Sequence, residues 1–298
     1  MKIIGGSASK VLTEDICNFI SRGIGYINLL PSDVLLTTFS DGEPRIEIKE
    51  NMRNEDVFII QSLSYPINDH LMELMFILDA LKRSDVHSIT VVMPYYGCGR
   101  QDKKDKPRVP ISSKVVADML EMSGIKRLVT LDLHAPQIQG FFSIPVDNLY
   151  GSSVFLPHMK KFKNGLSIIS PDAGGNERAT HYAKKLDCEM SFCYKHRSNP
   201  NEIGEMKLIG SVEGRDCVIV DDICDTAGTL TKSANKLKEA GALSVNAFIT
   251  HGVLSGDGVE KVNDSCIDSI YITDSIQQPE KVLKNNKFHI VSIDELIG

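Results

Sequence analysis

The chain has 298 residues, of which 42% are hydrophobic and 24% are charged, and its formal net charge is −6. This length predicts about two domains, and the composition is typical of a soluble globular protein. The charge excludes a protein that coats nucleic acid, because no excess of basic residues exists to neutralise phosphates. The N-terminus lacks the apolar run of a signal peptide, and no stretch reaches membrane-spanning length. Seven cysteines without a CxxC pair indicate free thiols in a reducing cytoplasm.

Short β-branched runs alternate with amphipathic helical patterns along the chain. Strands are predicted at 57–61, 88–93, 128–133, 166–170, 190–194, 218–221, 245–250 and 269–273. One helix is predicted to be capped by Asn68 and another to open at Ser112 or Ser113, and further helices are predicted at about 176–186 and 229–240. The alternation predicts an α/β fold with mostly parallel sheets flanked by helices. A seam near 149–153 predicts two similar units, residues 1–150 and 151–298.

A cationic loop follows the predicted strand 88–93. It carries five basic side chains within the nine residues 100–108. Ligands of open parallel sheets bind beyond the carboxyl ends of the strands, so this position favours a loop that grips and releases a polyphosphate. A solvated surface loop is the alternative.

Two further strand ends carry candidate metal ligands. Asp132 and His134 are two residues apart, so we expect them to project to one side of the strand, where they can position a hydrated metal or bind a triphosphate. Asp172 follows the strand 166–170 and precedes two glycines, which allow close backbone approach before a helix. Each feature by itself is also compatible with a purely structural role.

Lys195 and Arg197 follow the predicted strand 190–194. On an extended segment their side chains lie on one side, where they supply a point charge and a bidentate fork for a transferring phosphoryl group. A solvated pair of loop charges explains the same residues equally well.

The segment 217–229 combines a buried strand, two adjacent acids and a small-residue turn before a helix. Free backbone N–H groups and the helix dipole at such a turn bind phosphate. The paired carboxylates of Asp221 and Asp222 can accept hydrogen bonds from vicinal hydroxyls or hold Mg²⁺. An ordinary βα turn explains one acid, but not three acids with two threonines.

Together these segments resemble the ribose-phosphate diphosphokinase family, also called phosphoribosyl pyrophosphate synthetases. The matching segments run through nearly the whole chain in the family's order: 39–43, 100–106, 132–142, 170–175, Lys195 with Arg197, and 221–229. The last segment alone would indicate only the wider phosphoribosyltransferase fold. The resemblance implies that both units have this fold.

The resemblance further implies the reaction of ATP with ribose 5-phosphate, which gives 5-phosphoribosyl 1-diphosphate and AMP with Mg²⁺ as cofactor. The anomeric hydroxyl attacks the β-phosphorus. The implied roles are ATP binding for Phe39, Asp41, Gly42, Glu43, Arg100, Gln101 and Asp102, Mg²⁺ binding for Asp132, His134 and Asp172, catalysis for Lys195 and Arg197, and ribose 5-phosphate binding for Arg197, Asp221, Asp222, Asp225, Thr226, Ala227, Gly228 and Thr229. In the family the adenine turn at 39–43 reaches ATP from a neighbouring subunit, so a homo-oligomer built from dimers, such as a hexamer, is expected.

Three departures from the family concern regulation and catalysis. His196 stands between the two catalytic cations, where relatives often carry Arg or Glu. Asn51 replaces a serine of the family's phosphate and ADP regulatory region, and the chain ends at Gly298, short of the tail that many regulated members have. We therefore do not expect phosphate activation or ADP inhibition in the usual form.

Two other functions compete with this one. A phosphoribosyltransferase, which passes the sugar to a base, accounts for 221–229 but not for the adenine turn or the cationic loop. A catalytically silent regulatory subunit of the synthetase would carry insertions in its catalytic loops, and none is evident.

Overall fold

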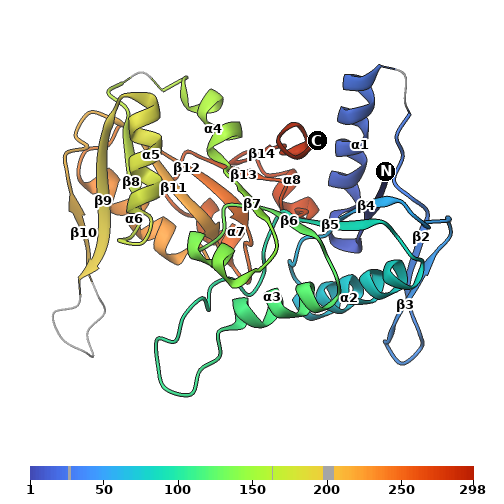
Figure 1. The fold of residues 1–298 in the computed structure, drawn as a ribbon. Helices are drawn as coiled ribbons and strands as arrows, with labels where there is room; N and C mark the ends of the chain where they lie inside the picture. The colour runs from blue at the N-terminus through green and yellow to red at the C-terminus, as the bar shows by residue number, and fades with distance from the viewer. Residues whose placement is uncertain (26–27, 163, 197–204) are drawn as a thin grey trace. The chain divides into compact units, whose positions relative to one another are not determined.

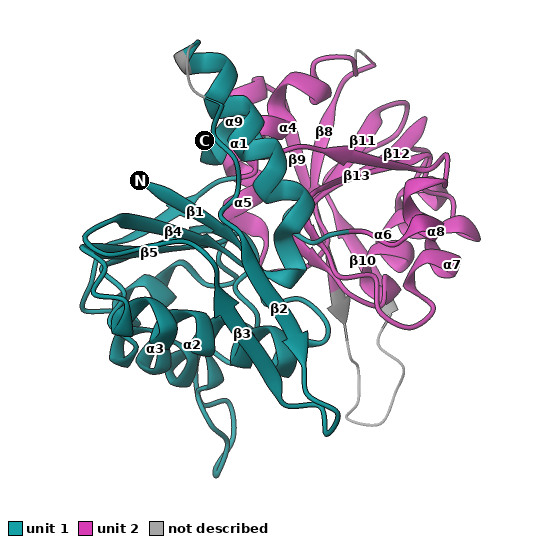
Figure 2. Cartoon of the chain, turned by 90° about the vertical axis from the view of Figure 1, so that its right-hand side faces the viewer, with its two compact units in different colours: residues 1–150, 275–277, 293–298 teal, residues 151–274, 278–292 magenta. Residues whose placement is uncertain are grey.

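The computed structural model describes residues 1–25, 28–162, 164–196 and 205–298 of the chain (Figure 1). The chain forms two compact units (Figure 2): unit 1 holds Met1–Tyr150, Ser275–Gln277 and Ile293–Gly298, and unit 2 holds Gly151–Asp274 and Gln278–Ser292. Each unit has its own sheet flanked by helices, and the predicted α/β fold is confirmed. Two short segments near the C-terminus therefore belong to the first unit, which no break in the sequence pattern indicates.

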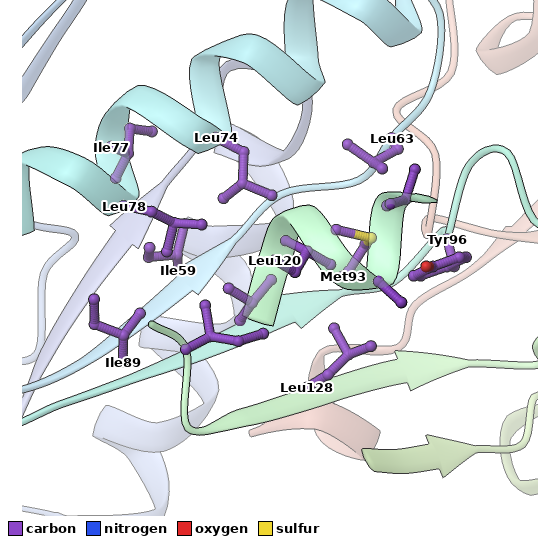
Figure 3. Packing of buried hydrophobic residues seen from close by; sticks show 14 of the residues in the cluster. Ile59, Leu63, Leu74, Ile77, Leu78, Ile89, Met93, Tyr96, Leu120 and Leu128 are labelled. Carbon is purple, nitrogen blue, oxygen red and sulfur yellow. The ribbon is translucent and has the colours of Figure 1, made fainter. Parts of the chain in front are cut away.

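Unit 1 is built on a parallel sheet whose five strands have the order β1-β4-β5-β6-β7. Their bounds are β1 Lys2–Gly5, β4 Asp56–Ile60, β5 Ser88–Met93, β6 Arg127–Leu131 and β7 Val146–Leu149. The helices are α1 Lys10–Ile24, α2 Ile67–Arg83, α3 Ser112–Met122 and α9 Asp294–Ile297, with short 3-10 helices at Ser7–Ser9 and Pro136–Phe141. Figure 3 shows Leu74, Leu78 and Leu120 of α2 and α3 packed over Ile59 and Ile89 of the sheet. Burial of these side chains holds both helices on one face, because apolar side chains gain free energy when they leave water.

A separate two-stranded hairpin, β2 (Val34–Thr38) and β3 (Pro44–Ile48), belongs to unit 1. Its side chains are mostly half-buried or exposed, so it lacks the apolar run of the other strands. The sequence pattern does not predict these two strands for that reason.

Unit 2 is built on a sheet of order β10-β9-β8-β11-β12-β13-β14, in which all described pairs are parallel except β9 with β10. The strands are β8 Ser167–Ser170, β9 Glu189–His196, β10 Glu205–Ile209, β11 Asp216–Cys224, β12 Ser244–Gly252, β13 Ser269–Thr273 and β14 Phe288–Val291. The helices are α4 Ser152–Met159, α5 Asn176–Leu186, α6 Gly228–Glu239, α7 Gly258–Asn263 and α8 Glu280–Leu283.

Two apolar clusters form the opposite faces of this sheet. Ile219 packs with the helices α6, α7 and α8, whereas Val218 and Val220 pack with α4 and α5. Successive residues of a strand point to opposite faces, so a strand covered on both sides must be apolar throughout. This explains the unbroken apolar run that precedes Asp221.

In the described part of the chain, no helix combines the length and apolar character needed to cross a bilayer. All seven cysteines lie among the described residues as free thiols, in agreement with the spacing argument. Burial raises the pKa of the Cys224 thiol to about 12, so this thiol stays protonated and unreactive at neutral pH.

Candidate active site

The acid pair Asp221 and Asp222 lies near the carboxyl end of β11. The strand continues to Cys224, so both acids belong to it, whereas the sequence pattern ended the strand at Asp221. The side chain of Asp221 is 23% exposed and that of Asp222 is 7% exposed. The Asp222 N–H donates a hydrogen bond to Asp221 Oδ1 at 3.0 Å. Burial, and next the charge of Asp222, raise the pKa of Asp221 well above its ordinary range.

Arg178 contacts both acids from the first turn of α5. Its Nη1 atom lies 3.3 Å from Asp221 Oδ1 and 3.2 Å from Asp222 Oδ1. The guanidinium charge opposes the rise in the pKa of Asp221. The sequence pattern did not assign Arg178 to the site. The sequence feature that could have indicated Arg178 is a cation in the first turn of a helix, where the helix dipole disfavours positive charge.

The loop after β11 leads directly into the N-terminus of α6. Ala227 has a left-handed backbone with φ 57°, and α6 begins at Gly228 without a side-chain cap. The first N–H groups of a helix have no partner within the helix, so this turn offers donors to an anion. Ser255 donates a hydrogen bond to the Asp225 carboxylate, and a Cβ at Gly258 would lie 2.8 Å from the Asp225 carbonyl oxygen. The hydrogen bond ties the loop to the segment before α7, and the close approach leaves no room for a side chain at Gly258.

Asp172 lies in the loop between β8 and α5, and β8 is the strand next to β11. Its Oδ1 atom accepts hydrogen bonds from the N–H groups of Gly174, at 2.8 Å, and Gly175, at 3.0 Å. The Asp172 side chain is exposed, and its charge contributes to the raised pKa of Asp221. The two neighbouring strand ends therefore present acids within electrostatic reach of each other.

Lys195 belongs to β9, on the other side of β8. The parallel register pairs Phe192 with Ser170, the last residue of β8, and Lys195 follows three residues later opposite Met206 of β10. The backbone of Lys195 thus lies beyond the carboxyl end of β8. Its side chain, like the whole of Arg197, lies outside the described part of the chain.

Asp132 and His134 do not share a strand face. β6 ends at Leu131, and Asp132 has a left-handed backbone with φ 39°. Asp132 is buried at 7% exposure, whereas His134 is exposed. The alternation on which that expectation depended stops at Leu131, so strand geometry does not set the direction of these two side chains.

The cationic loop between β5 and α3 has a buried root and an exposed middle. Tyr95 and Tyr96 are buried, and the Tyr96 hydroxyl donates to the carbonyl of Ser113 at 2.8 Å. The Ser113 hydroxyl donates to the Gln101 carbonyl at 2.9 Å. The exposed cations of this loop are Arg100, Lys103, Lys104, Lys106 and Arg108. Asp102 accepts a hydrogen bond from the Gln137 amide at 3.1 Å.

The adenine turn predicted at 39–43 forms the tip of the hairpin of β2 and β3 (Figure 1). The Phe39 N–H donates to the Glu43 carbonyl at 2.8 Å, and Gly42 has a φ of 93°, which favours glycine. The Glu43 N–H donates to Asp41 Oδ1 at 3.1 Å. Phe39 is 51% exposed, and the Arg45 guanidinium lies 5.7 Å from its ring centroid. The turn therefore displays an aromatic ring on a well-formed hairpin.

Within the described residues, no group of three or more His, Cys, Asp or Glu side chains could by itself hold a metal ion. A cation at Asp172 or at Asp132 and His134 would need further oxygen ligands. Phosphate oxygens and water are the partners that Mg²⁺ usually takes in nucleotide sites.

Two protein-family models match separate parts of the chain. Residues 1–124 match the N-terminal domain of ribose phosphate pyrophosphokinase, and residues 195–298 match the phosphoribosyl synthetase-associated domain. Ribose-phosphate pyrophosphokinase of Rhizobium meliloti (strain 1021) is 46% identical over 300 residues, which cover 100% of this chain and 94% of the relative. The chain belongs to the ribose-phosphate pyrophosphokinase family.

Other members of the family support this assignment. The ribose-phosphate pyrophosphokinase of Aquifex aeolicus (strain VF5) is 46% identical over 301 residues, which cover 100% of this chain and 94% of the relative. The crystal structure of phosphoribosylpyrophosphate synthetase from Mycobacterium smegmatis superposes with a TM-score of 0.91 at 31% identity, and covers 99% of this chain and 95% of that one. The resemblance inferred from the motifs is confirmed, and the chain is an enzyme of the ribose-phosphate pyrophosphokinase family.

Proposed function

We propose that this chain transfers the diphosphoryl group of ATP to the anomeric hydroxyl of ribose 5-phosphate, giving 5-phosphoribosyl 1-diphosphate and AMP for nucleotide biosynthesis. Family membership over the full chain supports this reaction. The observation that carries it is the exposed ring of Phe39 together with the exposed cations of the loop 100–108, because a phosphoribosyltransferase needs neither. The sugar-phosphate site is the acid pair on β11 followed by an uncapped helix N-terminus. A sugar phosphate offers the vicinal hydroxyls and the phosphate that these two features can bind.

Unit 2 binds the sugar phosphate in this proposal. The carboxylates of Asp221 and Asp222 accept hydrogen bonds from the ribose hydroxyls. The 5-phosphate binds the backbone N–H groups and hydroxyls of the loop, which comprises Asp225, Thr226, Ala227, Gly228 and Thr229. The left-handed Ala227 and the contact of Asp225 with Ser255 preorganise this loop, which lowers the entropy lost on binding.

Unit 1 binds ATP in this proposal. The exposed ring of Phe39 stacks on adenine, and the acids of the turn, Asp41 and Glu43, accept hydrogen bonds from its exocyclic amine. Arg100 and Gln101 bind the phosphates, and the exposed lysines of the loop add positive charge. Closure of this loop would exclude water and so prevent hydrolysis of ATP.

Mg²⁺ is the proposed cofactor, with carboxylate oxygens at two positions, one of which also offers the imidazole nitrogen of His134. Asp172 in unit 2 has one carboxylate oxygen fixed by two backbone N–H groups, and Asp132 and His134 form the second position in unit 1. When bound, the ion supplies positive charge to the phosphate oxygens of ATP. We assign stabilisation of the charge on the transferring group to Lys195 and Arg197, because phosphoryl transfer depends mainly on positioning and electrostatics.

The function is tested by measuring AMP released from ATP, Mg²⁺ and ribose 5-phosphate by the purified protein. We expect AMP and 5-phosphoribosyl 1-diphosphate in equal amounts, and no product when ribose 5-phosphate is left out. Turnover that requires a free base and 5-phosphoribosyl 1-diphosphate but no ATP would instead support a phosphoribosyltransferase. Absence of turnover would support the silent subunit.

The proposed assembly is a homo-oligomer of dimers in which each adenine turn serves a neighbouring subunit. We expect a Phe39→Ala/Asp41→Ala variant to have a KM for ATP raised roughly ten-fold or more, because base stacking on an aromatic ring contributes about 1–3 kcal/mol. Mixed with inactive Lys195→Ala subunits under exchange, it should regain about a quarter of the wild-type rate, since half of random dimers are mixed and each mixed dimer has one intact site.

The rate of the mixture is measured at an ATP concentration at which each variant alone has little activity. Mixing each variant with itself is the control. A rate equal to the sum of the separate variants would show that the turn acts within its own subunit.

A further inference from the structure

Arg178 has a position that helix stability does not explain. It is the third residue of α5, whose N-cap, Gly175, makes no side-chain cap hydrogen bond. Positive charge near a helix N-terminus opposes the helix dipole, and an acidic residue is favoured there. The side chain is only 20% exposed, so its charge is also largely removed from water. A compensating interaction must therefore hold it, and the acid pair of β11 supplies that interaction.

The contact bridges the carboxylates of two consecutive residues of β11. Consecutive residues on a strand point to opposite faces, and two negative charges repel. One nitrogen atom, Arg178 Nη1, nevertheless lies 3.3 Å from Asp221 Oδ1 and 3.2 Å from Asp222 Oδ1. The two oxygens therefore lie around a single cation. Two neighbouring sugar hydroxyls require two acceptors that converge in this way.

We propose that Arg178 is a positioning residue for the sugar: it holds Asp221 and Asp222 together so that both accept hydrogen bonds from the vicinal hydroxyls of ribose 5-phosphate. This inference rests on the proposed function of the acid pair. The packing of α5 on β8 and β11 keeps the guanidinium in place. The positive charge of Arg178 also favours the ionised form of Asp221. An ionised carboxylate accepts stronger hydrogen bonds than a protonated carboxyl group does.

The test compares Arg178→Gln with Arg178→Lys. The glutamine variant loses the charge at similar length, and we expect its KM for ribose 5-phosphate to rise roughly ten- to a hundred-fold, the range for loss of hydrogen bonds to charged groups. Its KM for ATP should change less than about two-fold, because ATP contacts are assigned to other residues. The lysine variant keeps a cation and should recover most of the affinity, although it lacks the planar fork.

A matched control is Lys185→Gln, which removes an exposed cation from the last turn of the same helix. It should leave both KM values within about two-fold of wild type. Calorimetric titration of ribose 5-phosphate into each protein without ATP gives the same comparison independently of turnover. Thermal unfolding of each variant checks that the fold persists.

The outcomes separate this inference from the proposed function. Wild-type AMP formation together with an unchanged ribose 5-phosphate KM in Arg178→Gln would refute the positioning role alone. An equal rise in both KM values would also refute it, since a general structural defect affects both substrates. Calorimetric binding of ribose 5-phosphate without AMP formation would refute the proposed reaction, and the affinities of the variants would still decide the role of Arg178. If the wild type binds no ribose 5-phosphate, both proposals fail.

Discussion

Replacement of Lys195 by alanine is expected to lower kcat roughly 10³-fold while KM for ATP and KM for ribose 5-phosphate change little. Removing one group that stabilises transition-state charge costs about two to three powers of ten, and cations in phosphoryl transfer reach the upper part of that range or more. The backbone of Lys195 lies in β9, beyond the end of β8, and pairs with Met206. Because β9 is paired with β8 over Glu189–Phe192 and with β10 over Phe192–His196, loss of the Lys195 side chain should leave the fold intact.

The variant is assayed under saturating substrates, and nucleotide binding is measured separately by calorimetry. Lys207→Ala is a suitable control, because it removes an exposed cation from β10, the strand paired with β9, where Lys207 lies opposite Tyr194. We expect the control to keep its kcat within about two-fold of wild type. An unchanged kcat in Lys195→Ala would exclude Lys195 from catalysis.

Replacement of Asp221 by asparagine is expected to weaken ribose 5-phosphate binding and to stabilise the free protein. The KM for ribose 5-phosphate should rise roughly ten- to a hundred-fold, because a hydrogen bond to a charged group contributes about 1.5–3 kcal/mol. The free energy of unfolding should increase at neutral pH. Burial and the neighbouring charge of Asp222 raise the pKa of Asp221, so the ionised acid destabilises the folded state.

The sign of this effect depends on pH. The pKa of Asp221 in the folded protein lies above the unfolded value of about 4. The wild type therefore loses stability as pH rises from the unfolded pKa towards the folded pKa, and the asparagine variant does not. The two proteins should be most similar near pH 4 and should differ most above the folded pKa.

Urea unfolding from pH 4.5 to 8 measures this difference. Glu50→Gln provides a control of opposite sign, because hydrogen bonding from Lys2 lowers the pKa of Glu50 and its charge therefore stabilises the fold above pH 4. That variant should be less stable than the wild type throughout this pH range, by a modest and nearly constant amount because the pair is partly exposed. A wild type that is more stable than Asp221→Asn at pH 8 would contradict the proposed cost of this buried charge.

Predictions from sequence patterns were accurate where the pattern reflects burial. β5 and α5 begin and end at the predicted residues. Unbroken apolar runs and helical spacing of apolar residues indicate which faces become buried in the fold. The helix α2 begins at Ile67 with Pro66 as its N-cap, so the predicted cap at Asn68 was wrong by two residues. Edge strands such as β7 and β10 are short and only partly buried, so the sequence gives them no comparable signal.

The site divides in the same way. The loops that follow β5, β8 and β11 were placed by sequence, because a polar, glycine-rich turn after a buried strand marks the carboxyl end of a parallel sheet. The directions of the Asp132 and His134 side chains could not be predicted from sequence. The strand alternation on which that prediction depended ends at β6, and the next residue, Asp132, has a left-handed backbone. The full-chain match to relatives identified the family, and the individual roles of the site residues stay predictions.

Sequence alone determined the order of motifs along the chain, the α/β alternation and the place of Asp221 and Asp222 after a buried apolar run, because these depend on local periodicity and turn chemistry. The tertiary structure decided which distant groups meet. Arg178 and the acid pair are 43 and 44 residues apart, and they touch because α5 packs on β8 and β11. Such contacts depend on strand order and register, which the burial of many side chains sets together and no single segment encodes.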